Sequence, residues 1–179
     1  MAIVSNERST PVLLSYEEEI IEEAKEVINA QAQQISAMKQ QMANLDPVQR
    51  KFCQAMELEV LRWKYMLQTY HSTRFKKIQT LIAQLVRPFD VKLSVAERAF
   101  CDNLQAAVEA AVIDSSVEFT MEEEDLSGFV FFKALEDIHG IQLSGTETDE
   151  PMNIERNQIC FARFGKIRDL VERRMAILM

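Results

Sequence analysis

The feature that most constrains this chain is a long helical segment between two proline signals. Asp46-Pro47 is a helix start, because Asp caps the first turn and Pro at the first helical position lacks only an N–H that would stay unbonded there. The next stop signal is Arg87-Pro88. We therefore expect a helix to about Val86, roughly 60 Å long at about 1.5 Å per residue. So long a helix leaves little of a 179-residue chain to cover it.

The apolar side chains of this helix fall on two nearly opposite faces at about 100° per residue. The first face is a stripe made of Phe52, Met56, Val60, Trp63, Leu67 and Tyr70. The second face holds Leu58, Leu61 and Tyr65. A helix that is apolar on two sides must be covered on two sides. Because few other segments remain, a partner protein is the simplest cover for the second face.

Two further helices are expected around this one. Ser15 stands three residues before Glu18, which is the spacing of a capping box and predicts a helix start. An apolar stripe then continues for about 30 residues through Ile20, Ala24, Val27, Ile28, Ile35, Met38, Met42 and Leu45. Ser94 and Glu97 form a second capping box, and the helix that they open should end near Ile113.

The amino-acid pattern of the sequence changes after Asp114. An acidic run over residues 122–125 is typical of a solvated linker. Phe129-Val130-Phe131-Phe132 then predicts a largely buried strand, His139-Gly140 a turn, and Ile141-Gln142-Leu143 a second strand. Ile154 and the run Ile159-Cys160-Phe161 are further strand candidates. Residues 167–178 have helical spacing, although Ala176-Ile177-Leu178 also fits a closing strand.

These segments predict a mainly α fold with a small β-containing C-terminal domain, an α+β arrangement. We place a flexible N-terminal tail at residues 1–14, a helical bundle at 15–114, an acidic linker at 115–127, and the small β-containing domain with its C-terminal helix at 128–179. All four glycines lie in the last part of the chain, so the composition itself shifts at this boundary.

Net charge, cysteine content and the length of apolar runs limit the cellular compartment and the kinds of partner that we expect for this chain. A formal charge of −8 disfavours broad contact with a phosphate backbone, so direct DNA contact is expected to be minor at most. Cys53, Cys101 and Cys160 are scattered and odd in number, which fits buried thiols in a reducing compartment. No apolar run reaches about eighteen residues and no signal-peptide core is present, so we expect an intracellular, soluble protein with no membrane contact.

Motifs for chemistry are missing from the sequence. His71 and His139 are far apart, and no HExxH or CxxC spacing marks a metal site. The scattered glycines build neither a phosphate-binding loop nor a nucleophile turn. The carboxylates gather at helix starts and in the linker, where water solvates them. We therefore expect no catalysis, no metal, no cofactor and no small-molecule substrate.

The most informative stretch is the middle of the long helix, from Glu59 to Ile78. Aromatic and basic side chains alternate there, so large apolar area can be buried while cations reach carboxylates. Arg74 lies beside the Phe52 and Tyr70 line and, if buried, needs an acidic partner, either internal or on another protein. An ordinary amphipathic core helix explains the same pattern, and a nucleic-acid groove is disfavoured by the net charge.

This stretch resembles the long helix of the Sld-five family of GINS subunits. The matching positions are Glu59, Arg62, Lys64, Tyr65, Leu67, Thr69, Tyr70, Arg74, Lys77 and Ile78. A second similarity is the strand Phe129-Val130-Phe131 after an acidic linker, followed by a polar turn at Thr148-Asp149 and a C-terminal strand and helix unit. The sequence departs from the family pattern at Leu61, Trp63, Ser72 and Gln79. The N-terminal docking motif of some relatives has no counterpart in residues 1–11.

The resemblance implies a GINS-like helical domain followed by a small β domain. It implies a nuclear, non-catalytic subunit of a heterotetramer with three sister GINS subunits. That tetramer joins the MCM ring and its RecJ-like companion as the replicative helicase, in initiation, elongation and break-induced replication. The subunit-interface residues that it implies are Glu59, Arg62, Trp63, Lys64, Tyr65, Leu67, Tyr70, Arg74, Lys77, Ile78, Phe129 and Phe131.

Two other classes of protein fit parts of the sequence. The long apolar stripes fit a self-associating adaptor or coiled coil unrelated to replication, although the second helix breaks a sustained heptad pattern. A small helical enzyme with an unrecognised site would depend on side chains such as Tyr70 and Arg74 for turnover. Co-expression with sister subunits separates the first class from the scaffold.

Overall fold

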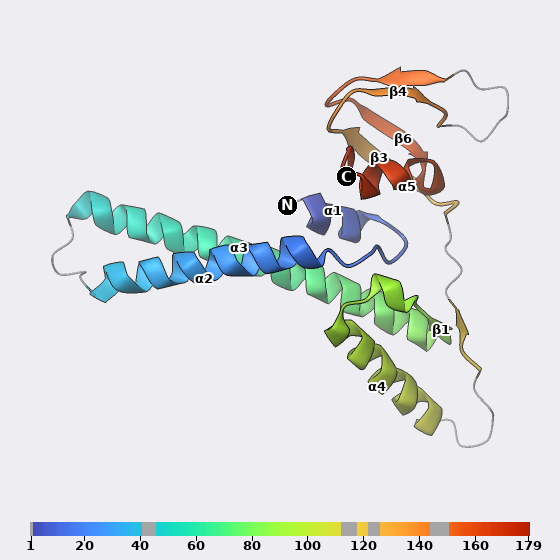
Figure 1. Ribbon diagram of the computed structural model, residues 1–179, viewed down its shortest axis with the longest axis horizontal. Coiled ribbons are helices and arrows are strands. Elements are labelled where there is room, and N and C mark those ends of the chain that lie inside the picture. The colour runs from blue at the N-terminus through green and yellow to red at the C-terminus, as the bar shows by residue number, and fades with distance from the viewer. Residues whose placement is uncertain (1, 41–45, 112–117, 122–125, 144–150) are drawn as a thin grey trace. The chain divides into compact units, whose positions relative to one another are not determined.

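The structure, a computed structural model, describes residues 2–40, 46–111, 118–121, 126–143 and 151–179 (Figure 1). The chain forms two compact units, one from residues 1–16 with 73–179 and one from residues 17–72. The mainly α fold with small C-terminal sheets agrees with the sequence expectation. The acidic run 122–125, the Thr148-Asp149 turn, Met42, Leu45 and Ile113 lie outside the described residues.

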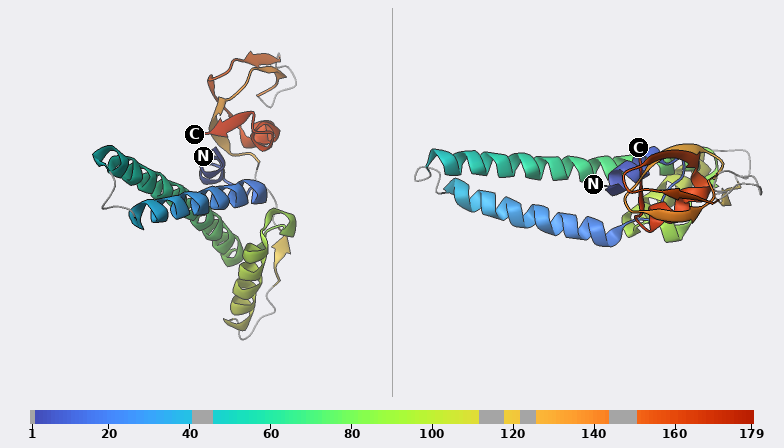
Figure 2. Two further views of the ribbon diagram at one scale, coloured as in Figure 1. Left: turned by 60° about the vertical axis from the view of Figure 1, so that its left-hand side comes forward. Right: turned by 90° about the horizontal axis from the view of Figure 1, so that it is seen from above.

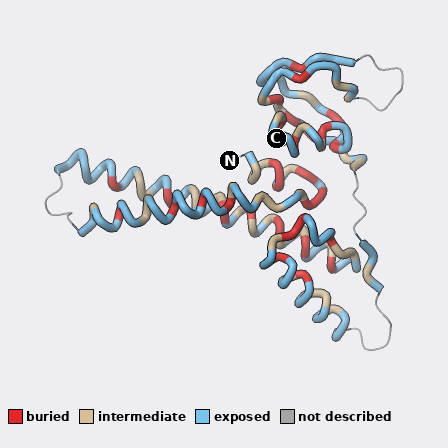
Figure 3. Tube along the Cα trace, viewed as in Figure 1, coloured by how far each residue is buried: buried red, intermediate tan, exposed pale blue. Residues whose placement is uncertain are grey.

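The unit of residues 17–72 is an antiparallel helix pair. Helix α2 (Glu18–Gln40) and the first part of helix α3 (Pro47–Ala83) lie side by side (Figures 1 and 2). Buried positions recur along both helices at helical spacing (Figure 3). They are Ile21, Ala24, Ile28 and Ile35 in α2 and Cys53, Val60, Leu67 and Tyr70 in α3. The predicted stripes are confirmed in part. Ala24, Ile28, Ile35, Val60, Leu67 and Tyr70 are buried as expected, Ile20, Met38, Met56 and Trp63 are only partly buried, and Val27 and Phe52 are exposed. Ile21 and Cys53 are buried although the stripes did not include them.

Local caps set the helix starts. The Asp46 carboxylate accepts a hydrogen bond from the Gln49 backbone N–H at 2.7 Å, and the Gln49 side-chain oxygen Oε1 accepts one from the Asp46 backbone N–H at 3.1 Å, so α3 begins where the sequence predicted. Helix α2 begins three residues later than predicted. The reason is that the Tyr16 amide bonds to the Lys92 carbonyl at 3.1 Å, which holds the chain out of helical geometry at that point.

The helical part of the other unit surrounds the end of α3. After α3 come strand β1 (Val86–Arg87), the short 3-10 helix η2 (Asp90–Lys92) and helix α4 (Val95–Ala111). Strand β2 (Thr120–Met121) pairs in parallel with β1. The predicted capping box at α4 is present, because Ser94 and Glu97 exchange bonds at 2.9 and 3.3 Å. The apolar core of this part consists of Leu13, Ile78, Ile82, Leu93 and Cys101.

The first residues correct the expectation of a flexible tail. They form helix α1 (Ala2–Ser9), and the segment that follows buries Val12 in the core of the C-terminal sheet and Leu13 in the helical core. Asn6 and Glu7 are buried too. The sequence signal was weak because α1 is a short, polar helix whose burial depends on partners far along the chain.

The C-terminal part is a small sheet covered by one helix. Strands β3 (Phe129–Ala134), β6 (Ile159–Arg163) and β7 (Ala176–Leu178) form an antiparallel sheet in the order β6-β3-β7, with helix α5 (Phe164–Glu172) between β6 and β7 in the chain. Strands β4 (Ile138–Ile141) and β5 (Met152–Ile154) form a separate pair. The inner face packs around Phe132, Phe164, Ile167 and Leu178.

Three local expectations in this part were wrong or only partly right. Strand β3 is not largely buried but alternates, with Phe129 and Phe131 exposed. His139-Gly140 is not a turn but lies inside β4, where the register shifts and Gly140 has φ +69°. Residues 167–178 are divided between α5 and β7, so the closing strand left open by the sequence is confirmed.

Candidate subunit interfaces

One face of α3 stays uncovered within the chain. Leu58, Leu61 and Tyr65, called the α3 strip below, are 68, 61 and 68% exposed. At about 100° per residue these three lie within about 60° of one another. The buried positions Val60 and Leu67 lie on nearly the opposite face of α3. The second apolar face predicted from the sequence therefore exists and points to solvent.

Charged groups flank the α3 strip. Arg62 lies next to it on the helix surface, and its Nη1 is 3.6 Å from Oε1 of Glu59. Both side chains are more than half exposed, so the pair contributes little to folding. Lys64 is exposed and Trp63 is partly buried. The face thus offers apolar area with charges at its rim, which is how protein interfaces are usually built.

A buried ionic network fixes the other half of α3. Arg74 is 0% exposed, and its Nε and Nη2 donate to the two carboxylate oxygens of Glu97 at 2.7 and 3.1 Å. Its Nη1 donates to Glu7 at 2.9 Å and to the Leu14 carbonyl at 2.7 Å, and Nη2 also donates to the Lys92 carbonyl at 2.8 Å. The acidic partners that the sequence demanded for Arg74 are therefore internal.

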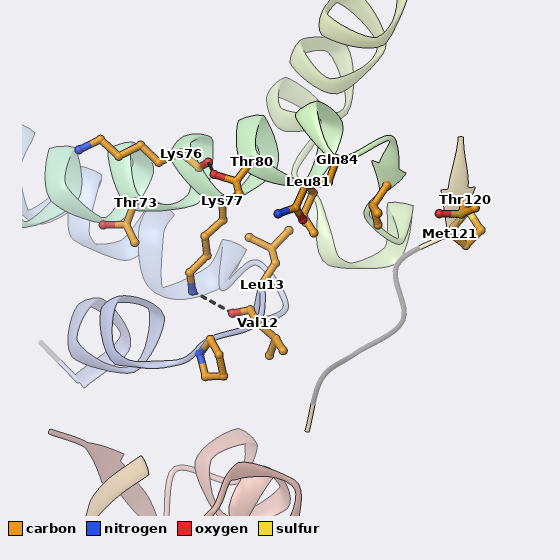
Figure 4. A pocket seen from close by; sticks show the side chains of 12 residues that line it. Val12, Leu13, Thr73, Lys76, Lys77, Thr80, Leu81, Gln84, Thr120 and Met121 are labelled. Carbon is orange, nitrogen blue, oxygen red and sulfur yellow. Dashed lines mark hydrogen bonds between the residues drawn. The ribbon is translucent and has the colours of Figure 1, made fainter. Parts of the chain in front are cut away.

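The same network ties the N-terminal segment to α3. Lys77 Nζ lies 2.8 Å from the Glu7 carboxylate and donates to the Val12 carbonyl at 2.8 Å (Figure 4). Glu97, which caps α4, and Glu7, which lies in α1, both bind Arg74. A fully bonded buried ion pair fixes a specific arrangement rather than adding much net stability. The network therefore sets how α1, α3 and α4 meet.

Helix α1 also closes the edge of the C-terminal sheet. The Leu178 amide donates to Asn6 Oδ1 at 2.8 Å, and Ser5 Oγ donates to the Leu178 carbonyl at 2.7 Å. Side chains of α1 thus satisfy backbone groups on β7 that no strand pairs with, which protects a sheet edge. Neighbouring residues of α1 therefore bind two parts of the chain, since Ser5 and Asn6 bond to Leu178 in β7 and Glu7 bonds to Arg74.

The outer face of the sheet is aromatic and uncovered. Phe129, Phe131 and Phe161 are 56, 56 and 53% exposed and lie on paired strands, with Phe131 directly opposite Phe161. Phe129 and Phe161 stack with ring centres 5.2 Å apart, and Phe131 lies tilted at 4.6 Å from Phe161. We call this surface, together with Ile159, Lys133 and Arg163, the sheet face. An exposed cluster of aromatic side chains is typical of the centre of a protein interface.

The structure divides the sequence-predicted interface residues into two groups. Exposed or partly exposed are Glu59, Arg62, Trp63, Lys64, Tyr65, Lys77, Phe129 and Phe131. Buried inside the chain are Leu67, Tyr70, Arg74 and Ile78. These four correct the expectation, because a side chain already enclosed by its own chain offers no surface to a partner. They contribute instead to packing within the chain.

Sequence reasoning left several members of these surfaces out of the interface set. Leu58 and Leu61 were recognised as apolar but not included. Phe161 and Ile159 were recognised only as strand residues, and their place on the sheet face follows from pairing with β3. Glu7 carried no local signal, since its partners Arg74 and Lys77 lie more than 60 residues away.

A concave feature lies next to the network. A pocket of about 810 Å³ lies between residues 11–13, the end of α3 and strands β1 and β2 (Figure 4). Its described lining includes Lys76, Thr80, Gln84 and Met121 but neither His nor a carboxylate. No three His, Cys, Asp or Glu side chains of the described residues gather as metal ligands. Across the described helices, none is long and apolar enough to span a membrane.

The cysteines belong to the cores. Cys53 and Cys101 are buried free thiols and Cys160 is partly buried. Burial raises the pKa of both the Cys101 and the Cys160 thiol above the ordinary value. A raised pKa keeps a thiol protonated and unreactive at neutral pH.

Comparison with known proteins shows which family this chain resembles. Residues 124–178, the C-terminal sheet with its helix, match the family described as DNA replication complex GINS protein SLD5 C-terminus. A protein of Chaetomium globosum named DNA replication complex GINS protein SLD5 is 24% identical over 185 residues, which cover 93% of this chain and 82% of that protein. The chain is therefore similar to the SLD5 family.

Proposed function

We propose that this chain is a non-catalytic structural subunit of the GINS complex in the nucleus. It joins three sister subunits in a heterotetramer, and that tetramer joins the MCM ring and its RecJ-like companion as the replicative helicase. The proposal rests on the SLD5-family match and on the name of the Chaetomium globosum relative, a DNA replication complex protein. The role extends from initiation to elongation and break-induced replication, and it needs no cofactor or small-molecule substrate.

The observation that carries the proposal is the uncovered α3 strip. Three large apolar side chains, each more than 60% exposed, lie together on a helix whose other side is already packed on α2. Clustered exposed apolar side chains of this kind mark protein interaction sites. Arg62, Glu59 and Lys64 supply the charged rim. We propose that a sister subunit covers the strip, and that Phe129 and Phe131 form a second interface.

The mechanism that follows is mechanical. The buried bonds of Arg74 hold α1, α3 and α4 in one arrangement, and α1 holds the edge of β7. The unit that is fixed in this way presents the sheet face to a partner as a rigid surface, which is what holding a ring-shaped motor requires. The buried charged groups Arg74, Glu7 and Glu97 are paired with one another, so they serve the fold rather than a reaction.

Self-association is the alternative that the same strip allows. A second copy of the chain would cover the strip equally well if the helix carried a sustained apolar seam. The strip extends over only eight residues, from Leu58 to Tyr65, whereas a coiled-coil seam repeats over several heptads. The alternative is therefore the weaker of the two.

The test is capture by tagged sister subunits from the same organism. The variant Leu58→Glu with Tyr65→Glu places two charges in the strip and should lower the captured amount of this chain at least tenfold. The variant Gln33→Glu with Gln34→Glu adds the same charge at exposed positions of α2 and should leave capture unchanged. Equal capture of both variants and the wild-type chain would show that the strip is no interface.

A further inference from the structure

The sheet face is a basic and aromatic surface on an acidic chain. Its side chains lie on alternate positions of β3 and β6, where the register pairs Phe129 with Arg163, Phe131 with Phe161 and Lys133 with Ile159. The described positions of this face carry two cations and no carboxylate, although the whole chain has a formal charge of −8. The local charge is therefore opposite to the charge of the molecule.

The ring geometry decides which class of molecule fits the sheet face. Single-stranded nucleic acid binds such sheets by stacking bases on the flat faces of exposed aromatic rings. Here Phe129 and Phe161 stack on each other at 17° between planes, and Phe131 leans on Phe161. The guanidinium carbon of Arg163 lies 5.4 Å from the centre of the Phe129 ring. Part of the Phe129 and Phe161 ring surface is thus covered by the neighbouring ring, and Arg163 lies near Phe129.

The number of cations on the sheet face also disfavours nucleic acid as its ligand. Each phosphate contact in single-stranded binding is made by a cation that releases counterions, and two cations supply only a small electrostatic gain. The surrounding negative charge of the chain opposes a polyanion further. A protein surface needs only one or two carboxylates to match Lys133 and Arg163, and its apolar side chains can pack on the ring edges.

From these observations we infer that the sheet face binds a protein surface on which one or two carboxylates flank apolar side chains, and that it does not bind nucleic acid. The inference deepens the proposed function, on which it rests, by giving the chemistry of the sister-subunit surface that covers Phe129 and Phe131. Apolar packing on the rings supplies the contact area. The pairs between carboxylates and Lys133 or Arg163 set the orientation and make assembly depend on salt.

The experiment uses the co-expressed four-subunit complex, diluted in steps and weighed molecule by molecule by mass photometry. This gives an apparent dissociation constant at 50 and at 500 mM salt. Two variants change the sheet face: Phe131→Ser with Phe161→Ser, and Lys133→Glu with Arg163→Glu. The control, Lys166→Glu with Arg173→Glu, reverses two exposed charges on and just after α5. Thermal melts of each isolated chain check folding.

The phenylalanine variant should raise the dissociation constant at least tenfold at both salt concentrations. The charge-reversal variant should raise it at least tenfold at 50 mM salt but far less at 500 mM, because salt screens the lost pairs. The control should stay within about twofold of the wild-type chain. Wild-type complex that assembles normally, with both sheet-face variants unaffected, would overturn this inference alone.

Two other outcomes are also decisive. A wild-type chain that does not assemble with the sister subunits overturns the proposed function and removes the ground for this inference as well. A labelled single-stranded oligothymidylate that binds the wild-type chain in fluorescence anisotropy, and loses that binding in the sheet-face variants alone, overturns the protein-only assignment. No oligothymidylate binding, together with salt-dependent loss of the complex in the charge-reversal variant, supports it.

Discussion

Removing the Glu7 carboxylate should destabilise the whole unit that Arg74 organises. In Glu7→Ala, Arg74 loses its bond at 2.9 Å and keeps Glu97, while Lys77 loses its carboxylate partner at 2.8 Å. Both Glu7 and Arg74 are at most 1% exposed, so their bond is shielded from bulk water. Removing one partner of a buried pair costs about 3–5 kcal/mol, and we expect the lower value because Glu97 remains.

A loss of about 3 kcal/mol corresponds to a fall of about 6–12 °C in Tm, at about 2–4 °C per kcal/mol for a chain of this size. Circular dichroism at 222 nm during heating measures it. Glu172→Ala is the matched control, because its partner Arg168 is on the surface at 2.8 Å. That exposed pair should cost less than about 1 kcal/mol. If Glu7→Ala melted within 1 °C of Glu172→Ala, the network would not be what fixes this unit.

Three further changes probe single features. Asn6→Ala should speed hydrogen exchange of the Leu178 amide at least tenfold, because that amide donates to Asn6, while the Met179 amide, bonded to Phe131, stays protected; equal acceleration of both would contradict a specific edge cap. Asp46→Ala should cost about 1 kcal/mol in urea unfolding through loss of the α3 cap, and Asp169→Ala, exposed on α5, serves as its control; no difference between the two would rule out the cap. Because burial raises the pKa of the Cys101 thiol, alkylation of Cys101 by iodoacetamide should be slower in the folded chain than in the urea-unfolded chain and should need a higher pH. The same raised pKa makes the free energy of unfolding fall as the pH rises past about 8.5, the usual pKa of an unfolded thiol. Alkylation of folded Cys101 at the rate of the unfolded chain would contradict this.

Local signals predicted much of the helical part. Asp46 and Ser94 are caps that act within four residues, so their geometry follows from sequence alone. The spacing of Val60 and Leu67 likewise predicted the buried face of α3. Arg74 shows the limit of such reasoning. Its position predicted a buried cation that needs an acid, but Glu7 and Glu97 become its partners only through folding.

The sheet part was less predictable for a physical reason. Phe129-Val130-Phe131-Phe132 is apolar at every position, so it lacks the alternation that would reveal which face is exposed. The packing of α5 and β7 on one side decides that Phe132 is buried and Phe131 is not. The same uncertainty about which side chains are exposed applies to the two interface surfaces. A sequence identifies large apolar side chains, but only the fold tells which of them the chain itself covers.

The most direct test of the central claim is the mass of the particle that this chain forms. The chain would be co-expressed with its three sister subunits, purified by size-exclusion chromatography and weighed by light scattering in line. Our account predicts one species whose mass equals the sum of four different subunits, one copy of each. A chain that elutes alone, or that pairs only with a second copy of itself, would contradict the account and favour a self-associating adaptor.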